Sequence, residues 1–370
     1  MDSMNRRRAL KTLFCSSAAL SLNLQSEAEA KVASKAIHLL AIGDFGTGGS
    51  DQKAVAKAMR EYVVSKKIQP AGLWMLGDNI YGSTIERAAK DRAEKAWKEA
   101  KELEKQKDGP KAKPKDSYYK ESSKDAFSVK SKRWQTDIEE MYPRSIFPGP
   151  QWAVLGNHDY HDNIGGEKVQ LAYAKKEGVR WHMPEKWYRV DLGSPEPLVT
   201  FLAVDTNFPV ISGTKHKKTG KIQSHMSEKE HAKQNEWLKA ELAKPRAPFT
   251  VVVGHHPLYS NGIHRDTKPL IEEWGNLFQE HKVHAYLCGH DHDMQHLELE
   301  GLFTSFILSG GGGARVRELT NKERKIPYGD HLNGFTHIQI EPHSLTISHH
   351  AINGGVLHRL VKKQDGKVIV

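Results

Sequence analysis

Short apolar runs alternate with stretches of helical periodicity along most of the chain. Apolar runs bounded by glycine or polar residues suit strands that are buried on both faces of a sheet. The predicted strands are residues 36–42, 73–76, 152–155, 187–192, 198–204, 249–253, 283–287, 337–340, 344–351 and 356–361. The predicted helices are residues 52–66, 169–176, 226–242 and 270–281. Ser50 or Asp51 should cap the first helix and Ser227 the third. This order predicts an α/β protein with parallel strands and with antiparallel pairing near the C-terminal end.

Five of these apolar runs end in a glycine that is followed by Asp, Asn or His. The five junctions are Gly43-Asp44, Gly77-Asp78-Asn79-Ile80-Tyr81, Gly156-Asn157-His158-Asp159, Gly254-His255-His256 and Gly289-His290-Asp291-His292. Taken singly, Asp and Asn after a strand are ordinary turn or cap residues. The carboxyl ends of parallel strands meet at one edge of a sheet, where open α/β folds bind ligands. Together, the junctions therefore predict a metal site at that edge.

The donor types restrict the metal. Mixed His, Asp and Asn ligation suits Fe, Zn or Mn, and the chain has only two cysteines, Cys15 and Cys288, which argues against an iron–sulfur cluster. His290 and His292 alternate in sequence, so their side chains point to the same side of an extended segment. Two metals that share a carboxylate can clamp both the attacking and the leaving oxygen of a phosphoryl transfer. Asp78 is the best candidate for the shared ligand.

The positive charge is concentrated in one segment. The 370-residue chain has a net charge of +10, and residues 86–133 contain 16 Lys or Arg against 10 Asp or Glu. The remaining charge is too small to indicate a nucleic-acid footprint, so we expect no nucleic acid as a specific ligand. We expect residues 86–107 to form a solvated helix and 108–132 a flexible loop. The alternative is an electrostatic arm for acidic partners.

The first thirty residues have the pattern of an export signal. Arg6-Arg7-Arg8 precedes a mildly apolar stretch, residues 9–24, and the small-residue sequence Ala28-Glu29-Ala30. Residues 5–11 resemble the twin-arginine signal, with Ala9 where Phe is usual. A disordered basic tail is the alternative. Because no later stretch reaches the ~20 apolar residues of a transmembrane helix, we expect a soluble protein, exported to the periplasm or secreted, with one domain over residues 31–370.

The five junctions together resemble the five-block signature of the calcineurin-like metallophosphoesterases. Tyr81 makes the chain similar to the purple acid phosphatases, particularly the small, tartrate-resistant kind. The similarity covers most of residues 36–360 and extends to Gln170-Leu171-Ala172-Tyr173, Arg180-Trp181, Tyr188-Arg189-Val190, and Gln234 with Trp237-Leu238. The resemblance implies a four-layer α/β/β/α sandwich of two mixed sheets with helices outside. The basic insert, residues 86–133, and the lack of a disulfide depart from the family pattern.

The resemblance also implies a dinuclear centre. A ferric site would use Asp44, Asp78, Tyr81 and His292, and a divalent site, for Fe, Zn or Mn, would use Asp78, Asn157, His255 and His290. A phenolate is a strong donor for a ferric ion, whereas neutral imidazoles and an amide suit a divalent one. The implied activity is that of an acid phosphatase, in which a metal-bound hydroxide hydrolyses the phosphate monoester of a small phosphorylated substrate.

Two histidines are implied to face the substrate. As a cation, His158 could bind phosphate oxygens or protonate the leaving alkoxide. Asp159 could hold the imidazole of His158 or cap a turn. His264 matches a second substrate-facing histidine of the family, although a loop histidine is often merely exposed. His256 stands where animal enzymes have an aromatic residue, and its role stays open.

Two other functions stay open. The first is a phosphodiesterase or nucleotidase of the same superfamily with another metal pair, in which Tyr81 packs rather than ligates. The second is an envelope binding protein in which the insert, residues 86–133, engages a polyanion and the metals are structural. The presence of every ligand of the family signature argues against the second function.

Overall fold

The computed structural model describes residues 36–82, 84–106, 109–113, 117, 127–163, 165–211 and 225–370, without side-chain detail for residues 84–91. The predicted signal, residues 1–30, lies outside the described residues, as does most of the predicted loop 108–132. Within the described part, no helix has the length and apolar character needed to cross a membrane.

An eight-stranded mixed sheet carries the first three junctions. Its strand order is β15-β14-β13-β12-β1-β2-β3-β4. The strands are β1 (Ile37–Ile42), β2 (Gly72–Met75), β3 (Gln151–Ala153), β4 (Trp181–His182), β12 (Gly334–Glu341), β13 (Ser344–Ala351), β14 (Val356–Lys362) and β15 (Val368–Ile369). β1 to β4 run parallel, whereas β12 to β15 pair antiparallel. The chain therefore leaves β1, β2 and β3 at the same edge of the sheet.

A seven-stranded mixed sheet carries the other two junctions. Its strand order is β11-β9-β10-β8-β7-β6-β5. The strands are β5 (Tyr188–Leu192), β6 (Val199–Ala203), β7 (Phe249–Val253), β8 (Ala285–Cys288), β9 (Met294–Leu297), β10 (Ser305–Ser309) and β11 (Tyr328–Asp330). β6, β7, β8 and β10 run parallel, and β5 and β9 are antiparallel to their neighbours. The chain leaves β7 and β8 at one edge of this sheet as well.

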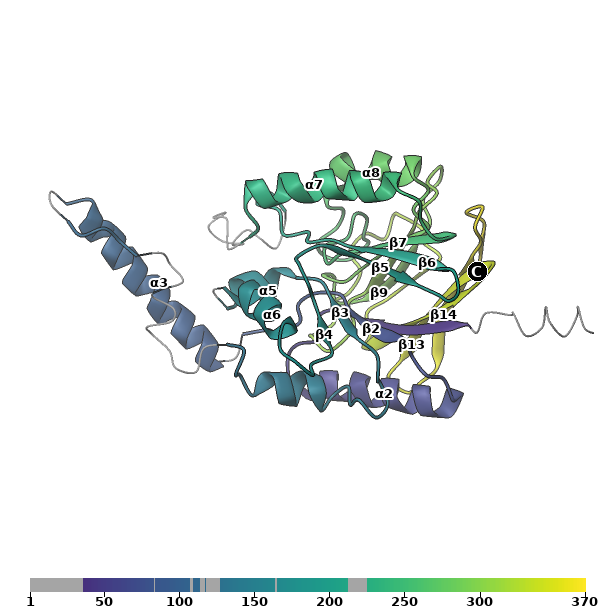
Figure 1. The fold of residues 1–370 in the computed structure, drawn as a ribbon, viewed down its shortest axis with the longest axis horizontal. Coiled ribbons are helices and arrows are strands. Elements are labelled where there is room, and N and C mark those ends of the chain that lie inside the picture. Colours follow the sequence, from purple (N-terminus) through teal and green to yellow (C-terminus); the bar gives the residue numbers. More distant parts are fainter. Residues whose placement is uncertain are drawn as a thin grey trace, which may run out of the picture. The chain divides into compact units, whose positions relative to one another are not determined.

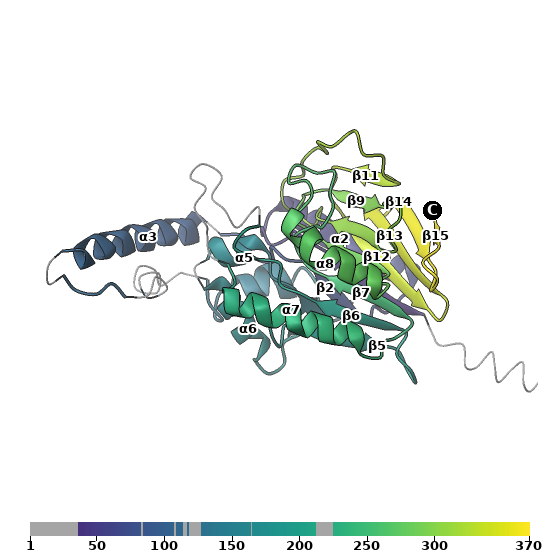
Figure 2. The ribbon, with the colours of Figure 1, turned by 90° about the horizontal axis from the view of Figure 1, so that it is seen from above.

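The two sheets pack face to face between outer helices, which confirms the expected four-layer sandwich. Figure 1 shows α7 (Glu228–Ala243) and α8 (Lys268–Glu280) outside the seven-stranded sheet and α2 (Ser50–Lys66) outside the other, and Figure 2 shows α7 and α8 side by side. Strand β1 shows why the sheet is covered on both faces. Leu39 and Ala41 pack between the sheets with Phe201 of β6, whereas Leu40 packs on the helix side with Met59 of α2. A strand that is apolar on both faces needs a layer on each side.

The capping predictions had mixed outcomes. Ser227 caps α7 in a capping box, because its Oγ accepts from the Glu230 N–H at 3.2 Å and the Glu230 carboxylate accepts from the Ser227 N–H at 2.8 Å. The prediction of Ser50 or Asp51 as the first cap was wrong, since both lie within α2 and Gly49 precedes it.

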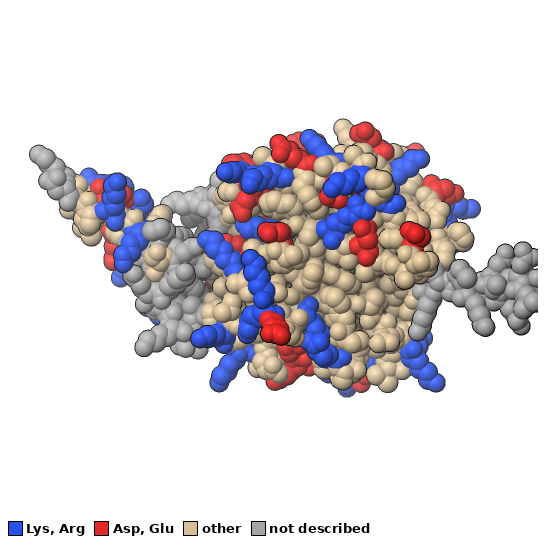
Figure 3. Space-filling view, in the orientation of Figure 1, with Lys and Arg blue, Asp and Glu red and all other residues tan. Residues whose placement is uncertain are grey.

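Basic and acidic side chains are interspersed over α7 and α8 (Figure 3).

A helix is present where the start of the charged insert predicted one. This helix, α3, spans Thr84–Glu104. Its exposed side chains form ion pairs one turn apart, at 3.4 Å between Lys98 and Glu94 and at 2.6 Å between Lys101 and Glu104. Pairs of this kind suit a solvated helix surface.

Two short helices lie next to the site. α5 (Asn157–His161) begins at the third junction, and α6 (Gly166–Ala174) follows it and contacts it. The sequence predicted α6 a few residues further along the chain and did not predict α5. As a consequence, the residues of the third junction lie in the first turn of a helix rather than in a loop.

Candidate metal centre

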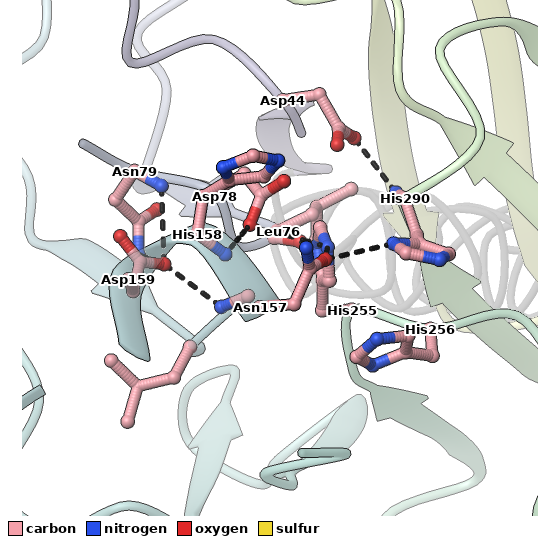
Figure 4. Close-up of polar contacts among 12 residues, drawn as sticks. Asp44, Leu76, Asp78, Asn79, Asn157, His158, Asp159, His255, His256 and His290 are labelled. Atoms are coloured by element: carbon pink, nitrogen blue, oxygen red, sulfur yellow. Dashed lines mark hydrogen bonds and ion pairs between the residues drawn. The ribbon is translucent and has the colours of Figure 1, made fainter. Parts of the chain in front are cut away.

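The five junctions meet at the edge where the two sheets face each other. The Asp44 carboxylate accepts a hydrogen bond from the His290 N–H at 2.8 Å, which joins the end of β1 to the end of β8 (Figure 4). The Asp78 carboxylate accepts from the His158 N–H at 2.8 Å, which joins the end of β2 to the start of α5. The site is therefore built from both sheets, and each contact fixes a functional carboxylate to the backbone of another junction.

The first group of side chains surrounds the Tyr81 hydroxyl. Its oxygen lies 3.4 Å from Asp44 Oδ1, 3.1 Å from Asp78 Oδ2 and 3.3 Å from His292 Nε2. His292 Nδ1 donates to the Arg315 carbonyl at 2.9 Å. This bond places the proton on Nδ1, so the lone pair of Nε2 faces the two carboxylates.

The second group converges on the Asn157 amide oxygen. Asn157 Oδ1 lies 3.1 Å from His255 Nε2 and 2.9 Å from His290 Nδ1. His255 Nδ1 donates to the Leu76 carbonyl at 2.8 Å, and burial lowers the pKa of His255. The neutral His255 ring therefore turns a lone pair toward an oxygen that is itself an acceptor. A cation between these two atoms would satisfy both.

The Asp78 carboxylate lies within reach of both groups. Its Oδ2 is the oxygen near the Tyr81 hydroxyl, and its Oδ1 lies 3.4 Å from His255 Nε2. Burial would raise the pKa of Asp78, but the neighbouring His255 and His158 bring it below its ordinary value. Asp78 is therefore the negative charge that the two groups have in common.

The backbone at the centre adopts conformations that side chains disfavour. Asp44, Asp78 and His290 have positive φ values of 58°, 52° and 71°. The left-handed region costs a residue other than glycine about 1–2 kcal/mol. Such strain is typical of functional sites, where surrounding structure holds it in place.

Glycine allows the close approach of the junctions. A Cβ atom on Gly156 would lie 2.2 Å from the Asp78 Oδ1 atom. A Cβ atom on Gly77 would lie 2.5 Å from His255 Nδ1, and Gly77 also has a φ of 89°. At these two junctions there is no room for a side chain, which explains the glycine before the functional residue. At Gly77 the positive φ also favours glycine.

The electrostatics of the first group favour a bound cation. Burial and the Asp78 charge raise the pKa of the Asp44 carboxyl well above its ordinary value. Burial and the same two carboxylates raise the pKa of the Tyr81 phenol well above its ordinary value. Two carboxylates and a phenol are thus buried together, beside imidazoles that burial keeps neutral. The donor set fits a metal ion, because a cation would offset the repulsion that holds these protons in place.

His256 belongs to the surroundings of His290. Its Nδ1 lies 2.8 Å from Thr206 Oγ1, and its ring centroid lies 4.2 Å from that of His290. Burial and the charge of His255 lower the pKa of His256 well below its ordinary value. The side chain, whose role the sequence left open, is thus a neutral ring that packs against His290 (Figure 4).

His158 lies at the entrance to the centre and has a carboxylate partner. Its Nδ1 is 2.9 Å from Asp162 Oδ2, and its ring centroid is 4.5 Å from that of Tyr81. Burial would lower the pKa of His158, but Asp78 and Asp162 raise it overall. Sequence reasoning missed Asp162, although its position one turn after His158 on a helix is a signal that could have identified it.

Asp159 does not hold the imidazole of His158. Its carboxylate accepts from the backbone N–H groups of Gly156 at 2.8 Å, Asn79 at 3.2 Å and Ile80 at 3.1 Å. Asp162 has the position that we expected for Asp159. The capping alternative therefore describes Asp159, which joins the second junction to the third.

His264 lies beside the second group. Its ring centroid is 4.2 Å from that of His290, and its backbone N–H donates to Asp291 Oδ1 at 3.0 Å. Arg317 Nη1 lies 3.1 Å from His264 Nε2, so the guanidinium donates to a neutral ring. His264 therefore lies next to His290, and its contact with a substrate stays a prediction. Arg317 carries no signal in the sequence.

A cavity of about 550 Å³ opens over the centre. Its lining includes Tyr81, His158, His292, Arg133, Arg315 and Arg317. A larger cavity, of about 610 Å³, is lined by Asn261 and residues from 318 to 331 and contains none of the predicted ligands. The smaller cavity is therefore the one that leads to the chemistry.

Comparison with known proteins identifies the family. Residues 37–294 match the calcineurin-like phosphoesterase family. Tartrate-resistant acid phosphatase type 5 of Oryctolagus cuniculus is 30% identical over 243 residues, which are 63% of this chain and 73% of that protein. Purple acid phosphatase 7 of Arabidopsis thaliana is 26% identical over 337 residues, or 87% of this chain and 85% of that protein.

The fold is also that of solved structures. GAP50, the anchor in the inner membrane complex of Plasmodium, superposes with a TM-score of 0.63 at 19% identity, covering 88% of this chain and 87% of that one. At this identity the likeness concerns the fold alone. The family match spans the junctions from Asp44 to His292. The chain therefore belongs to the calcineurin-like phosphoesterase family, and within it the chain is similar to the purple acid phosphatases.

Proposed function

We propose that this protein hydrolyses phosphate monoesters at a centre of Fe(III) and a divalent Fe, Zn or Mn ion. As a member of its family it is a metal-dependent phosphoester hydrolase, and its relatives are named acid phosphatases. The observation that carries the finer proposal is the Tyr81 hydroxyl, which lies 3.1–3.4 Å from Asp78, Asp44 and His292. A phenol among carboxylates becomes a phenolate ligand when a strongly polarising cation replaces its proton.

Each group of side chains would hold one ion. The first group, with Tyr81 at its middle, would hold the ferric ion, and Asn157, His255 and His290 would hold the divalent ion. Asp78 would bridge them, since its two oxygens face different groups. When bound, the ions would acidify a water molecule and polarise the phosphoryl group.

His158 supplies the acid chemistry of the chain itself. Its partner Asp162 fixes Nδ1, so Nε2 is left to bind a phosphate oxygen or to donate a proton to the leaving alkoxide. Because its pKa is raised, the imidazolium persists to a higher pH than that of an ordinary histidine. His264 lies on the other side, beside His290, where it would contact the substrate.

We also propose that the chain reaches the periplasm or the exterior through its N-terminal signal, residues 1–30, and that residues 31–370 form one domain with a surface insert at 86–133. The basis is the order of basic, apolar and small residues at the N-terminus. Sequencing the N-terminus of protein recovered outside the cytoplasm should find a start near residue 31. A start at Met1 would contradict the proposal.

A visible spectrum tests the metal assignment. Protein purified with its metals should contain iron and show a tyrosinate-to-ferric charge-transfer band, and Tyr81→Phe should remove the band. Tyr328→Phe is the matched control, because Tyr328 lines the other cavity and its loss should leave the band intact.

Three outcomes contradict the proposal in different ways. A colourless, active enzyme with Mn or Zn would favour the phosphodiesterase or nucleotidase alternative, in which Tyr81 packs. A band that survives in Tyr81→Phe would show that another group ligates the iron. Metal-loaded protein that turns over neither aryl phosphates nor bis-aryl phosphates would favour a binding protein.

A further inference from the structure

Three groups of His, Asp or Glu side chains in the described part of the chain are close enough to hold a metal ion. Two of these groups lie at the centre described above. The third consists of His158, His161 and Asp162, which lie on the short helix α5 and directly after it. Neither His161 nor Asp162 belongs to the predicted ligand set, so this group is a separate candidate for a metal site.

Helical spacing brings the three side chains together. His161 follows His158 by three residues and Asp162 follows it by four, the two spacings that place side chains on the same face of a helix. The Asp162 N–H donates to the His158 carbonyl at 3.1 Å, so the helical turn includes Asp162. One turn of the chain therefore builds the whole group, whereas the centre requires five junctions from two sheets.

The distances among the ligand atoms suit a small divalent ion. His158 Nδ1 lies 2.9 Å from Asp162 Oδ2, and His161 Nε2 lies 3.8 Å from Asp162 Oδ1. One ligand atom from each residue lies within 4.8 Å of the other two. Ligand atoms that bind a tetrahedral zinc ion at about 2.0–2.2 Å lie about 3.3–3.6 Å from one another. Small side-chain rotations would therefore bring all three atoms to bonding distance of one ion.

The donor types and their surroundings also fit a metal ion. Two imidazoles and a carboxylate suit zinc and similar divalent ions. The Gly82 N–H donates to Asp162 Oδ2 at 2.8 Å, and carboxylates that ligate metals are commonly held by such a bond. The three side chains are 11–29% exposed, so an ion can reach them from solution. We propose that His158, His161 and Asp162 form a third metal site, which binds a divalent ion of the zinc type at the entrance to the centre.

The charge of the cavity limits the strength of this site. Arg133, Arg315 and Arg317 line the same cavity as His158 and Asp162. Positive charges nearby oppose the binding of a further cation. The ion should therefore exchange with the solution instead of remaining on the purified protein, unlike the ions of the centre, which buried carboxylates would hold.

Occupation of the third site would change the role of His158. An ion on Nδ1 takes the place of the proton that His158 shares with Asp162, and this proton passes to solvent. The ring is then no longer the imidazolium that donates a proton to a leaving alkoxide. This consequence rests on the proposed function, whereas the metal site itself does not. The ion should slow substrates whose leaving group needs a proton and should affect the others less.

Equilibrium dialysis against zinc chloride tests the site directly. Protein with a filled centre is dialysed against increasing zinc, and all metals are measured, so that zinc replacing an ion of the centre is recognised by the ion released. The wild-type protein should bind one zinc ion beyond the content of the centre. His161→Gln and Asp162→Asn should each weaken this binding by about tenfold to a hundredfold or more, since even the loss of a ligand's hydrogen-bond partner costs this much. Both variants should keep the metals of the centre, which shows that they fold.

His231→Gln is the matched control for the dialysis. His231 also lies on a helix, α7, and its Nε2 is 2.8 Å from Glu273 Oε2 while its Nδ1 is 3.9 Å from Glu228 Oε2. Because these carboxylates contact different nitrogens of one ring, the three residues cannot share an ion. The additional zinc should therefore stay bound in His231→Gln.

Initial rates with and without zinc test the consequence for His158. Zinc at the concentration that fills the third site should lower kcat for glycerol phosphate, whose alkoxide needs a proton, by about tenfold or more. It should lower kcat for 4-nitrophenyl phosphate by a smaller factor, because nitrophenolate leaves as a stable anion. His161→Gln should have the wild-type rate without zinc and should resist the inhibition, since it removes a ligand of the ion and no group of the proposed mechanism.

The results distinguish failure of the site from failure of the proposed function. The site is wrong if the wild-type protein binds no additional zinc, or if His161→Gln and Asp162→Asn bind it as the wild type does. It is also wrong if His231→Gln weakens the binding equally. Equal inhibition of both substrates would overturn the effect on His158. If the protein hydrolyses no phosphate monoester but binds the additional zinc through His161 and Asp162, the proposed function fails and the site is confirmed.

Discussion

Histidine side chains gather in two regions of the molecule, the metal centre and the strand histidines, which we define as His337, His349, His350 and His358 on β12 to β14. In the strand region, both ring nitrogens of His337 and of His349 have partners in the protein. His337 has the Tyr62 hydroxyl 3.0 Å from Nδ1 and His38 3.0 Å from Nε2. His349 has Thr336 Oγ1 2.9 Å from Nδ1 and donates to the Gln295 carbonyl at 3.2 Å.

At the centre, one ring nitrogen of His255 and of His292 bonds to the backbone, and the other faces hydrogen-bond acceptors. His255 and His292 each donate from Nδ1 to a carbonyl, at 2.8 Å and 2.9 Å. Their Nε2 atoms face an amide oxygen, a phenol and carboxylates. Burial lowers the pKa of His292 to about 4 and that of His337 to about 3, so burial and titration do not separate the two regions. Convergence of lone pairs on acceptors, rather than histidine content, indicates a metal site.

The largest effect expected from this comparison concerns Asp78. Asp78→Asn removes the negative charge that both groups share, so both metals should be lost from the purified protein. Because a metal acting as a Lewis acid contributes several kcal/mol to such a reaction, kcat/KM for an aryl phosphate should fall by about a thousandfold or more. Metal analysis and initial rates measure both quantities.

Two controls make the Asp78 result specific. Asn157→Ala should lose the divalent ion and keep the ferric band, since it removes a ligand of only one group. His349→Gln changes an equally buried strand histidine and should keep both metals. If His349→Gln released metal to the same extent as Asp78→Asn, the distinction between the two regions would be wrong.

A smaller effect is expected in the acid stability of the strand region. Burial lowers the pKa of His337 and of His349 to about 3, whereas an unfolded histidine titrates near 6.5. Between these values the unfolded chain binds more protons. The stability that the neutral rings allow is therefore full above pH 6.5 and is lost as the pH falls toward 3, by about 1.4 kcal/mol per pH unit for each histidine.

Urea unfolding of the metal-free protein between pH 7 and pH 4.5 measures this slope. The double variant His337→Gln, His349→Gln removes two titrating groups and should reduce the slope, whatever its absolute stability. His350 and His358, whose pKa values burial lowers to about 4, should keep part of the slope. His343→Gln, which changes an exposed histidine between β12 and β13, should keep the wild-type slope. An unchanged slope in the double variant would show that other groups cause the acid sensitivity.

The sequence predicted the parts of the fold and site that follow from local pattern. The apolar runs before Asp44, Asp78 and Asn157 had to be buried strands, and their parallel order brings those residues to one edge. Strand β9 was missed because the polar residues Gln295 and His296 interrupt its apolar pattern, although both are buried. These polar residues are buried by contacts with distant parts of the chain, which the local sequence pattern does not reveal.

Residues that depend on the path of a loop could not be predicted. Arg317 lies in a segment without regular secondary structure, and its approach to the centre depends on contacts with His264 and His292 that no spacing reveals. Asp159 and Asp162 both occur near His158, and only the short helix α5 decides which of them meets its ring. The sequence therefore placed a carboxylate near His158, but only the structure shows that its partner is Asp162.

The smallest predicted effect concerns His158. The pKa of this histidine of the centre is raised, whereas burial lowers the pKa values of the strand histidines. Asp162 is one of the carboxylates that raise it, at 2.9 Å from Nδ1. If the cationic ring is the active form, activity declines as the pH rises through this pKa. Asp162→Asn removes the charge, so the pKa of His158 should fall and the basic limb of the kcat/KM profile should move about one pH unit lower.

The matched control is Asp137→Asn, which removes another carboxylate from the same cavity, one that pairs with Arg133 at 2.6 Å instead of with His158. This variant should leave the basic limb in place. A basic limb that moves equally in both variants would mean that the general charge of the cavity sets the profile. A limb that moves in neither would mean that Asp162 only orients the ring, so that Asp78 rather than Asp162 keeps His158 protonated while the strand histidines stay neutral.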